Sequence, residues 1–196
     1  EPLLYKEKKQ HSVPFFLPGA ALNTYAIKAF NACYYAAQCK KVDPFISHLD
    51  DYFYPLDAVE HWNRCYGKKG FLQSQFVVPF KNGPEALEEI LTKLTEKECA
   101  SFLAVLKKFG PENQGSLSFP FEGYTLALDI PIKNREIFSF LDQLDQIVIQ
   151  NGGRVYLAKD ARMKGETFKQ MYPKFNQWLA IKEKIDPDWK CNSSLA

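Results

Sequence analysis

The side chains best suited to chemistry in this sequence lie within residues 154–162. Seven consecutive residues hold a phenol, an ammonium, a carboxylate and a guanidinium: Tyr156, Lys159, Asp160 and Arg162. The alternation around Tyr156 predicts a strand, with Val155 and Leu157 on one face and the phenol on the other. Charged groups at the end of a strand can line a polar site, or they can simply be solvated there. The local sequence favours charges that are simply solvated at a strand end. Whether they line a site instead depends on features elsewhere in the chain.

Three other stretches place polar or small residues on strand faces. Gln73 and Gln75 point the same way, and two neighbouring amides can exchange hydrogen bonds with a polyhydroxylated ligand. Lys107 shares a face with apolar residues, where an ammonium must be paired, solvated or directed into a cleft. Thr125 and Ala127 are small enough to leave room for a ligand. Sheet pairing could gather these residues and the phenol on one wall. The alternative is that these residues lie on a partly solvent-exposed outer face of the sheet, with Lys107 at its edge.

Hydrophobic periodicity predicts the elements that must position these side chains. The predicted helices cover residues 20–38, 58–66, 84–94, 137–148 and 166–184, the last interrupted at Pro173. The predicted strands cover 71–79, 102–109 and 154–157, and the segments 117–121 and 124–130 make one or two more. From residue 71 onward the order is β-α-β-β-α-β, which is typical of a ferredoxin-like α+β core with an antiparallel sheet. A helical extension precedes this core and a helical tail follows it.

Composition limits the class of protein. Of 196 residues, 46% are hydrophobic and 15% are aromatic, which excludes a disordered chain. A net charge of +2 gives no electrostatic reason to expect nucleic-acid binding. No apolar run approaches the roughly 18 residues of a membrane-spanning helix. Five cysteines without a C-x-x-C pair indicate a reducing, cytoplasmic compartment.

Motifs for metals and nucleotide phosphates are missing from the sequence. None of the three histidines is spaced four residues from another, so we expect no metal site. Neither a P-loop nor a G-x-G-x-x-G motif occurs, so this chain offers no phosphate loop of its own. The first residue is Glu1 rather than Met, and we therefore expect the chain to be a portion of a longer protein.

Several short segments together are characteristic of one family. In chain order they are Val13-Pro14-Phe15, Pro18-Gly19, Leu22-Asn23, Ala29-Phe30-Asn31, Tyr34-Tyr35, Tyr54-Pro55-Leu56-Asp57, His61-Trp62-Asn63-Arg64, Tyr66-Gly67-Lys68, Gly70-Phe71 with Gln73 and Gln75, Phe109-Gly110-Pro111, Leu117-Ser118-Phe119-Pro120, Tyr156-Leu157-Ala158-Lys159-Asp160 and Met171-Tyr172-Pro173. Each motif is weak alone, but the set runs through nearly the whole chain and is specific in combination.

This set resembles the C-terminal portion of FAD-dependent oxidoreductases of the vanillyl-alcohol-oxidase superfamily, in the branch of the decaprenylphosphoryl-ribose oxidases and their relatives. In that family an N-terminal domain binds FAD, and a following domain with an antiparallel sheet forms the substrate pocket. The resemblance therefore implies a substrate-binding (cap) domain over residues 1–154. It also implies a tail over 155–196 that packs on an FAD-binding domain missing from the sequence.

The resemblance further implies roles for particular residues. The residues expected on the substrate side are Gln73, Gln75, Asn63, Lys107, Thr125 and Ala127. Tyr156 and Lys159 would be catalytic, where substrate meets flavin, and Lys159 would also contact the cofactor. A cation there, which we expect Asp160 to hold, favours the reduced flavin. Positions 125 and 127 depart from the asparagine and cysteine of the mycobacterial branch, which leaves the sugar-lipid substrate open.

We therefore expect the full-length protein to be an FAD-dependent oxidoreductase that acts on a secondary alcohol of a sugar or sugar-phospholipid, and this portion alone to be inactive and free of FAD. The partners implied are the FAD-binding domain, the substrate and a short-chain reductase that completes an epimerisation. Peripheral association of the full-length protein with the inner membrane is compatible with such a substrate. Two alternatives stay open: a stand-alone ferredoxin-like binding or regulatory module without redox activity, and the cap domain of an aldonolactone-type oxidase.

Overall fold

The structure is a computed structural model that describes residues 11–18, 23–41, 44–54, 57–99, 101 and 103–192. Its internal contacts divide the chain into two compact units, Glu1–Phe71 and Leu72–Ala196. None of the helices in the described ranges has both the length and the hydropathy of a membrane-spanning segment.

The first unit is built from short strands and helices. Its elements are β1 (His11–Ser12), α1 (Thr24–Gln38), α2 (Leu49–Phe53), β2 (Val59–Glu60) and the 3-10 helix η2 (Trp62–Tyr66). Strands β1 and β2 pair in parallel, and Arg64 Nη1 donates to the Val13 carbonyl at 2.8 Å. These contacts join the start of the unit to its end.

Two helix predictions fall in this unit. The start of the helix predicted over 20–38 lies outside the described residues; its described part is α1, and Asn23 caps it by accepting a hydrogen bond from the Ala26 N–H at 2.9 Å. The helix predicted over 58–66 is wrong. Strand β2 and η2 occupy that stretch, because His61 adopts the left-handed conformation (φ 56°) and breaks any helix there.

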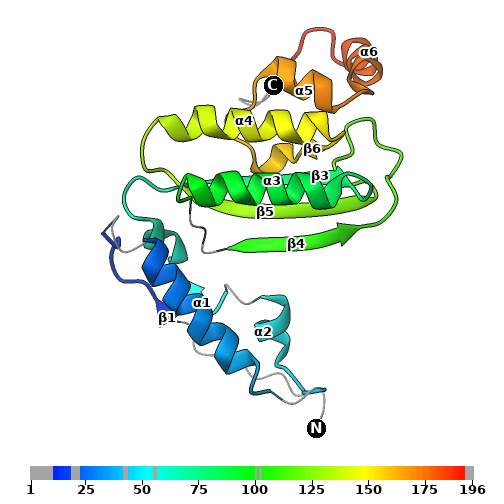
Figure 1. Cartoon of the computed structure of the whole chain (residues 1–196). Helices are drawn as coiled ribbons and strands as arrows, with labels where there is room; N and C mark the ends of the chain where they lie inside the picture. Colours follow the sequence, from blue (N-terminus) through cyan, green and yellow to red (C-terminus); the bar gives the residue numbers. More distant parts are fainter. Residues whose placement is uncertain are drawn as a thin grey trace. The chain divides into compact units, whose positions relative to one another are not determined.

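The second unit has the predicted ferredoxin-like order. Its elements are β3 (Phe71–Pro79, which begins at the last residue of the first unit), α3 (Gly83–Glu96), β4 (Ala104–Phe109), β5 (Gly123–Pro131), α4 (Glu136–Gln150) and β6 (Arg154–Val155). The strands lie in the order β4-β5-β3-β6, and both β4 with β5 and β3 with β6 are antiparallel. The α+β fold with an antiparallel sheet is thus confirmed (Figure 1). Phe102, the predicted start of β4, lies outside the described residues.

Two strand predictions in this unit need correction. Residues 117–121 form no strand but a loop before β5. The strand predicted over 154–157 stops at Val155, and Leu157–Lys159 form a 3-10 turn, η3. The turn is closed by hydrogen bonds from the Lys159 N–H to the Tyr156 carbonyl and from the Asp160 N–H to the Leu157 carbonyl, at 3.1 and 3.2 Å. Backbone bonds that close a turn are unavailable to a strand ladder, so β6 ends there.

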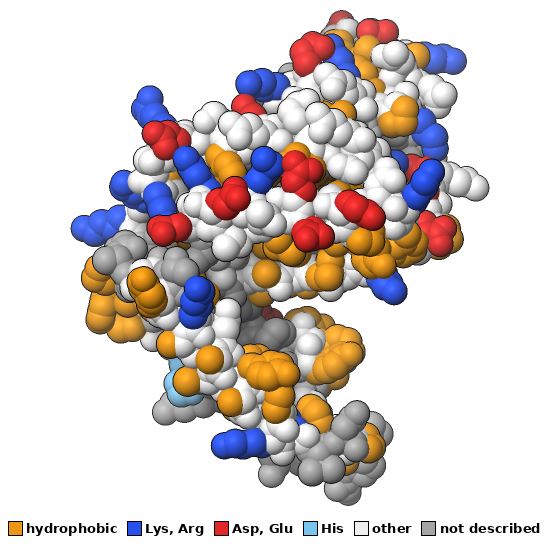
Figure 2. All heavy atoms as spheres, viewed as in Figure 1, with side chains coloured by type: hydrophobic (Ala, Val, Ile, Leu, Met, Phe, Trp, Pro, Cys, Tyr) orange, Lys and Arg blue, Asp and Glu red, His pale blue; other side chains and the backbone are white. Residues whose placement is uncertain are grey.

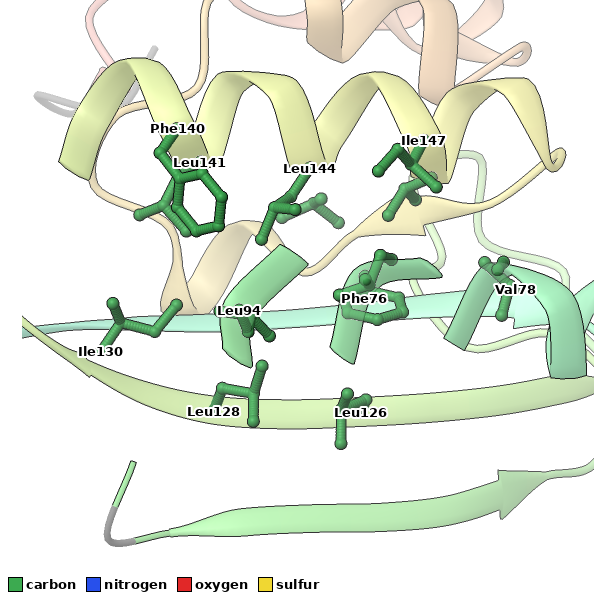
Figure 3. Close-up of a cluster of buried hydrophobic side chains, with 14 of the residues drawn as sticks. Phe76, Val78, Leu94, Leu126, Leu128, Ile130, Phe140, Leu141, Leu144 and Ile147 are labelled. Carbon is green, nitrogen blue, oxygen red and sulfur yellow. The ribbon is translucent and has the colours of Figure 1, made fainter. Parts of the chain in front are cut away.

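Helices α3 and α4 cover one face of the sheet. Figure 3 shows Phe140, Leu141 and Leu144 of α4 directed toward the side chains of the strands below. The strand residues that complete this core are Phe76, Val78, Leu126, Leu128 and Ile130. The outer side of the helical layer carries acidic and basic side chains (Figure 2). Burial of the apolar stripes on α3 and α4 is therefore what fixes which side of the sheet faces inward.

Close backbone packing between β3 and β5 requires a glycine. A Cβ atom added at Gly123 would lie 2.1 Å from the Val78 carbonyl oxygen, closer than any non-bonded contact allows. Any other residue at the start of β5 would force the two strands apart.

The tail after β6 folds back onto this unit through buried contacts. It consists of η3, α5 (Gly165–Met171) and α6 (Phe175–Ile185), and the predicted interruption at Pro173 separates the two helices. Tyr172 is 1% exposed and its hydroxyl donates to the Val155 carbonyl at 2.7 Å. The Val155 N–H in turn points at the Met171 sulfur at 3.3 Å. The domain boundary expected at 154/155 concerns packing on an FAD-binding domain and stays a prediction.

The buried phenol of Tyr172 should make the protein sensitive to alkali. Burial raises the pKa of Tyr172 from 10.0 to about 12, while the Arg154 charge opposes the rise. Because the folded state holds this proton more tightly, the stability it contributes is present below pH 10 and is lost as the pH rises toward 12. Urea unfolding at a series of pH values should show a loss of about 1.4 kcal/mol per pH unit in that window. Tyr172→Phe should lack this loss; an unchanged alkaline slope in that variant would contradict the assignment.

Candidate functional site

The face of the sheet opposite the helices gathers the polar residues singled out in the sequence. We call it the polar face; its polar and small residues are Gln73, Gln75, Lys107, Thr125, Ala127, Asp129 and Tyr156, and the apolar Phe71, Val77, Val105 and Phe109 share it. Register places Lys107 directly opposite Thr125. Directly opposed residues share a face, and so do alternate residues along a strand. Register and hydrogen bonds thus place the polar and small groups of β3, β4 and β5 on one side of the sheet, while Tyr156 follows the end of β6.

Hydrogen bonds across β3 and β5 orient the two amides. Gln75 Nε2 donates to Thr125 Oγ1 at 3.1 Å, and Gln73 Nε2 donates to Asp129 Oδ1 at 3.1 Å. Each bond uses one N–H of an amide that has two, as well as an acceptor oxygen. The remaining groups of these amides, on a half-buried Gln73 and on a Gln75 that is 9% exposed, are the ones that could exchange hydrogen bonds with a ligand. Thr125 is 1% exposed, so its hydroxyl serves mainly to hold Gln75 in place.

Tyr156 continues the polar face beyond the end of β6. Its N–H donates to the Gln75 carbonyl at 2.7 Å, which places it opposite Gln75. Its ring stacks on Phe119, with centroids 4.5 Å apart and planes 24° from parallel. Phe119 in turn meets Phe109 of β4 edge to face at 5.8 Å. The phenol therefore sits in an aromatic row that fixes the plane of its ring.

Arg154 ties the 111–121 loop to β6. Its Nη1 donates to the Ser118 carbonyl at 2.6 Å and pairs with Glu112 at 3.1 Å. Its guanidinium also lies 4.6 Å from the centre of the Phe121 ring. Sequence reasoning did not assign Arg154 or Phe119 to the site. The sequence features that could have pointed to them are the arginine at the start of the 154–162 stretch and the aromatic residue within Leu117-Ser118-Phe119-Pro120.

Lys159 ends η3, three residues after Tyr156. In the described part of the chain, no carboxylate lies at ion-pair distance from the ammonium of Lys159 or from that of Lys107. The expectation that Asp160 holds Lys159 is wrong. Asp160 instead accepts hydrogen bonds from the Arg162 and Met163 N–H groups at 3.1 and 2.6 Å, because these amides follow it in the same turn.

Asn63 belongs to the first unit. It lies in η2, and its side chain is exposed. Its part in substrate binding stays a prediction, as do the individual roles expected for the residues of the polar face.

Fold and site together define a class. An α+β unit with helices on one sheet face, and with amides, two lysines and a phenol on or beside the other, is suited to bind a polar organic ligand. Its donors suit hydroxyl and anionic groups.

Comparison with known proteins identifies the family. The chain belongs to the D-arabinono-1,4-lactone oxidase family, whose model matches residues 64–193. It is 37% identical, over its entire length, to 42% of the decaprenylphosphoryl-beta-D-ribose oxidase of Mycolicibacterium smegmatis. It is 20% identical, over 62% of its length, to 28% of the L-gulono-1,4-lactone dehydrogenase of Mycobacterium tuberculosis. The chain thus spans less than half the length of these relatives, both of which are oxidoreductases by name.

Arg154 should keep the 111–121 loop against the sheet. Arg154→Met retains much of the apolar stem but removes the bond to Ser118 and the pair with Glu112, leaving a half-buried carbonyl without its donor. We expect a loss of about 1–3 kcal/mol in stability and faster proteolytic cleavage within 111–121. Glu112→Gln is the matched control: it keeps the Ser118 bond and removes only the partly exposed ion pairs of Glu112 with Arg154 and Lys174, so it should cost less than about 1 kcal/mol. Equal effects of the two variants would show that the Ser118 bond does not hold the loop.

Proposed function

We propose that this chain forms the substrate side of an FAD-dependent oxidoreductase that oxidises a secondary alcohol of a sugar or sugar-phospholipid. The observation that carries the proposal is the polar face, where two oriented amides, a lysine and a stacked phenol share one side of the sheet. Family membership supports the oxidoreductase class, because both named relatives oxidise or dehydrogenate carbohydrate derivatives by name.

The amides suit the sugar ring of such a substrate, and the lysine suits its phosphate. Sugar hydroxyl groups both donate and accept hydrogen bonds, as carboxamides do, so Gln73 and Gln75 can fix the orientation of a sugar ring. Lys107 is exposed at the edge strand β4, opposite Thr125, where an ammonium can attract a phosphate. Ala127 keeps the centre of the face open to a ring.

The residues around η3 fit the requirements of a flavin. When bound, FAD supplies the acceptor for the hydride that leaves the alcohol carbon. Lys159, an ammonium without a carboxylate at ion-pair distance among the described residues, would lie beside the pyrimidine edge and stabilise negative charge there. Tyr156, held by Phe119, would orient the alcohol hydroxyl.

The FAD itself would be held by a domain outside this sequence, with residues 155–196 packing on it. The tail exposes large apolar side chains that such a contact would cover: Ile181 is 54% and Ile185 77% exposed. A short-chain reductase that completes an epimerisation, and peripheral contact with the inner membrane from a cytoplasmic location, belong to the same proposal.

The second candidate is an aldonolactone-type oxidase. It is favoured by the family model and by the lactone dehydrogenase among the relatives. Thr125 and Ala127 differ from the asparagine and cysteine expected for the sugar-lipid branch, so these positions bear on the choice. Mixing the FAD-loaded protein with decaprenylphosphoryl-β-D-ribose or with L-gulono-1,4-lactone, and following flavin absorbance, separates the two candidates. If the protein is a binding module without redox activity, neither compound should change the flavin absorbance.

The chain by itself should fold without binding FAD. Its described helices offer no glycine-rich turn for a pyrophosphate, and the sequence holds no phosphate loop. Titration of the purified chain with FAD, followed by fluorescence quenching, should give no stoichiometric complex. A yellow one-to-one complex would contradict the idea that a separate domain holds the cofactor.

Lys159→Ala should slow the chemical step while leaving the fold and bound FAD intact. Loss of one cation at developing negative charge costs about 10²–10³-fold in rate. We therefore expect substrate to reduce and bleach the flavin at least about tenfold more slowly in a rapid-mixing experiment; this lower limit is set below the range given above. The control is Lys169→Ala, which removes an exposed cation of the same tail and should leave the rate unchanged. An unaltered rate in Lys159→Ala would show that this lysine is only a solvated charge at the end of η3.

A further inference from the structure

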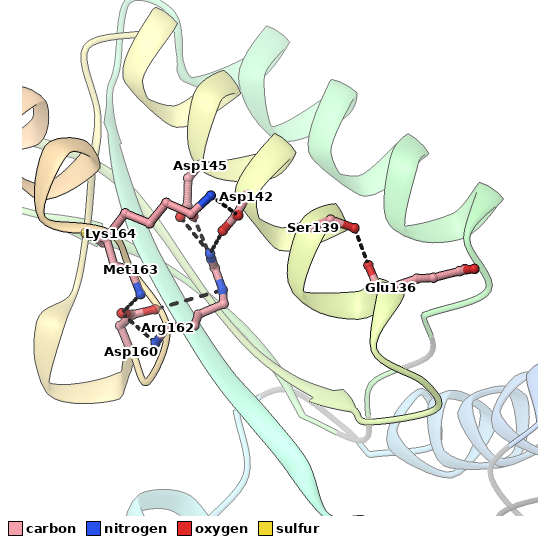
Figure 4. Close-up of polar contacts among 8 residues, drawn as sticks. All are labelled: Glu136, Ser139, Asp142, Asp145, Asp160, Arg162, Met163 and Lys164. Atoms are coloured by element: carbon pink, nitrogen blue, oxygen red, sulfur yellow. Dashed lines mark hydrogen bonds and ion pairs between the residues drawn. The ribbon is translucent and has the colours of Figure 1, made fainter.

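Arg162 is a buried cation that the proposed reaction does not use. Its side chain is 7% exposed and contacts two carboxylates of α4 (Figure 4). Nη1 and Nη2 donate to the two oxygens of Asp145 at 2.9 and 2.8 Å, which is a bidentate pair. Nη1 also donates to Asp142 at 2.8 Å. The Asp160 carboxylate lies 4.0 Å from Nε.

The charges in this cluster hold Arg162 in one place. Burial opposes the positive charge, but the hydrogen bonds and the negative charge of Asp145, Asp160 and Asp142 outweigh it and raise the pKa of the guanidinium. Arginine therefore stays charged at every pH at which the protein folds. A buried charge with a bidentate partner cannot move without leaving a carboxylate unpaired in the interior, which is costly.

Arg162 fixes one end of the segment that carries Tyr156 and Lys159. At the other end the Tyr156 N–H is bonded to β3 and the Tyr156 ring is stacked on Phe119. Between the two anchors, η3 and the Asp160 turn are closed by hydrogen bonds from the Lys159 and Met163 N–H groups. Lys159 is thus three residues from each anchor. Its own ammonium has no carboxylate at ion-pair distance in the described ranges, so these anchors determine where its backbone lies.

We propose that Arg162 is a positioning residue for Lys159: by pairing with Asp145 and Asp142 it holds the 156–163 segment on α4, and so sets where the Lys159 ammonium meets the flavin. The proposal rests on the proposed function. It assigns Arg162 no contact with substrate or cofactor; all its effect passes through Lys159.

The test is a double-mutant cycle on the protein that contains this chain together with its FAD-binding domain. The variants are Arg162→Gln, Lys159→Ala and the pair, and the measurement is the two-electron midpoint potential of the bound flavin by dithionite titration. A cation beside the flavin favours its reduced form. We expect Lys159→Ala to disfavour reduction by about tenfold, which is about 30 mV for a two-electron couple. Arg162→Gln should reproduce most of that shift, and the pair should shift no further than Lys159→Ala alone.

Further variants separate positioning from general damage. Asp142→Asn removes the negative charge that pairs with both Arg162 and Lys164 and keeps the bidentate pair with Asp145, so it should give a smaller shift with the same dependence on Lys159. It also keeps the cycle measurable if Arg162→Gln does not fold. Arg162→Lys retains one charged contact and should recover part of the lost potential. Lys169→Gln removes an exposed ion pair of the same tail and should leave the potential unchanged.

The outcomes distinguish this proposal from the proposed function. If the potential shifts of Arg162→Gln and Lys159→Ala add in the double variant, the two residues act independently. That result would overturn the proposal for Arg162. A wild-type potential in Arg162→Gln, or in Lys159→Ala, would overturn it as well. Failure of both alcohols to bleach the wild-type flavin would refute the substrate class, while the dithionite cycle would still decide whether Arg162 acts through Lys159.

Discussion

The alternation of side chains along β5 is the constraint on which the rest of the second unit depends. On one side Leu126, Leu128 and Ile130 complete the core beneath α3 and α4; on the other lie Thr125, Ala127 and Asp129. A slip of one residue against β3 or β4 would exchange the two sets and bury a carboxylate under the helices. The same apolar contacts that stabilise the fold therefore dictate which residues lie on the polar face. Gly123 sustains this arrangement, since only a residue without a side chain allows β5 to begin so close to β3.

The end of β6 depends on a different kind of force. This strand is two residues long, so backbone pairing alone holds Tyr156 and Lys159 weakly. The segment is instead fixed by discrete side-chain contacts. Tyr172 bonds to the Val155 carbonyl from the tail, Phe119 stacks on the phenol, and Arg162 pairs with the carboxylates of α4. A sheet built by hydrophobic burial thus carries, at its edge, a turn built by polar and aromatic contacts, where the angle and distance of each contact determine position.

Periodicity predicted what depends on burial and missed what depends on individual contacts. The bounds of β3 were predicted to the residue, and α3, α4 and β5 to within two residues, because their apolar faces recur over nine residues or more. The helix predicted over 58–66 failed at a single left-handed residue, His61, which no pattern of hydrophobicity reveals. The polar face followed the same rule, because alternation predicted that Gln73, Gln75 and Thr125 lie on it. By contrast, the pairing of Asp160 with backbone rather than with Lys159 could be seen only in three dimensions. Arg154 and Phe119 were missed because the contacts that matter for them cross between elements distant in sequence.

If the polar face binds the substrate as proposed, the separation of the two faces also bears on how members of this family can differ in substrate. Thr125 and Ala127 lie on the central strand, opposite Lys107 and Val105, and neither takes part in the core beneath the helices. Exchange of these residues alters hydrogen bonding and volume on the polar face and leaves the packing of Leu126 and Leu128 unchanged. The Gln75–Thr125 bond is the exception, since an apolar residue at 125 would release the amide that it orients. Under the proposed function, substrate choice could therefore vary at position 127 almost independently of stability. At position 125 it is coupled to the orientation of Gln75, and any change there must supply another acceptor for that amide.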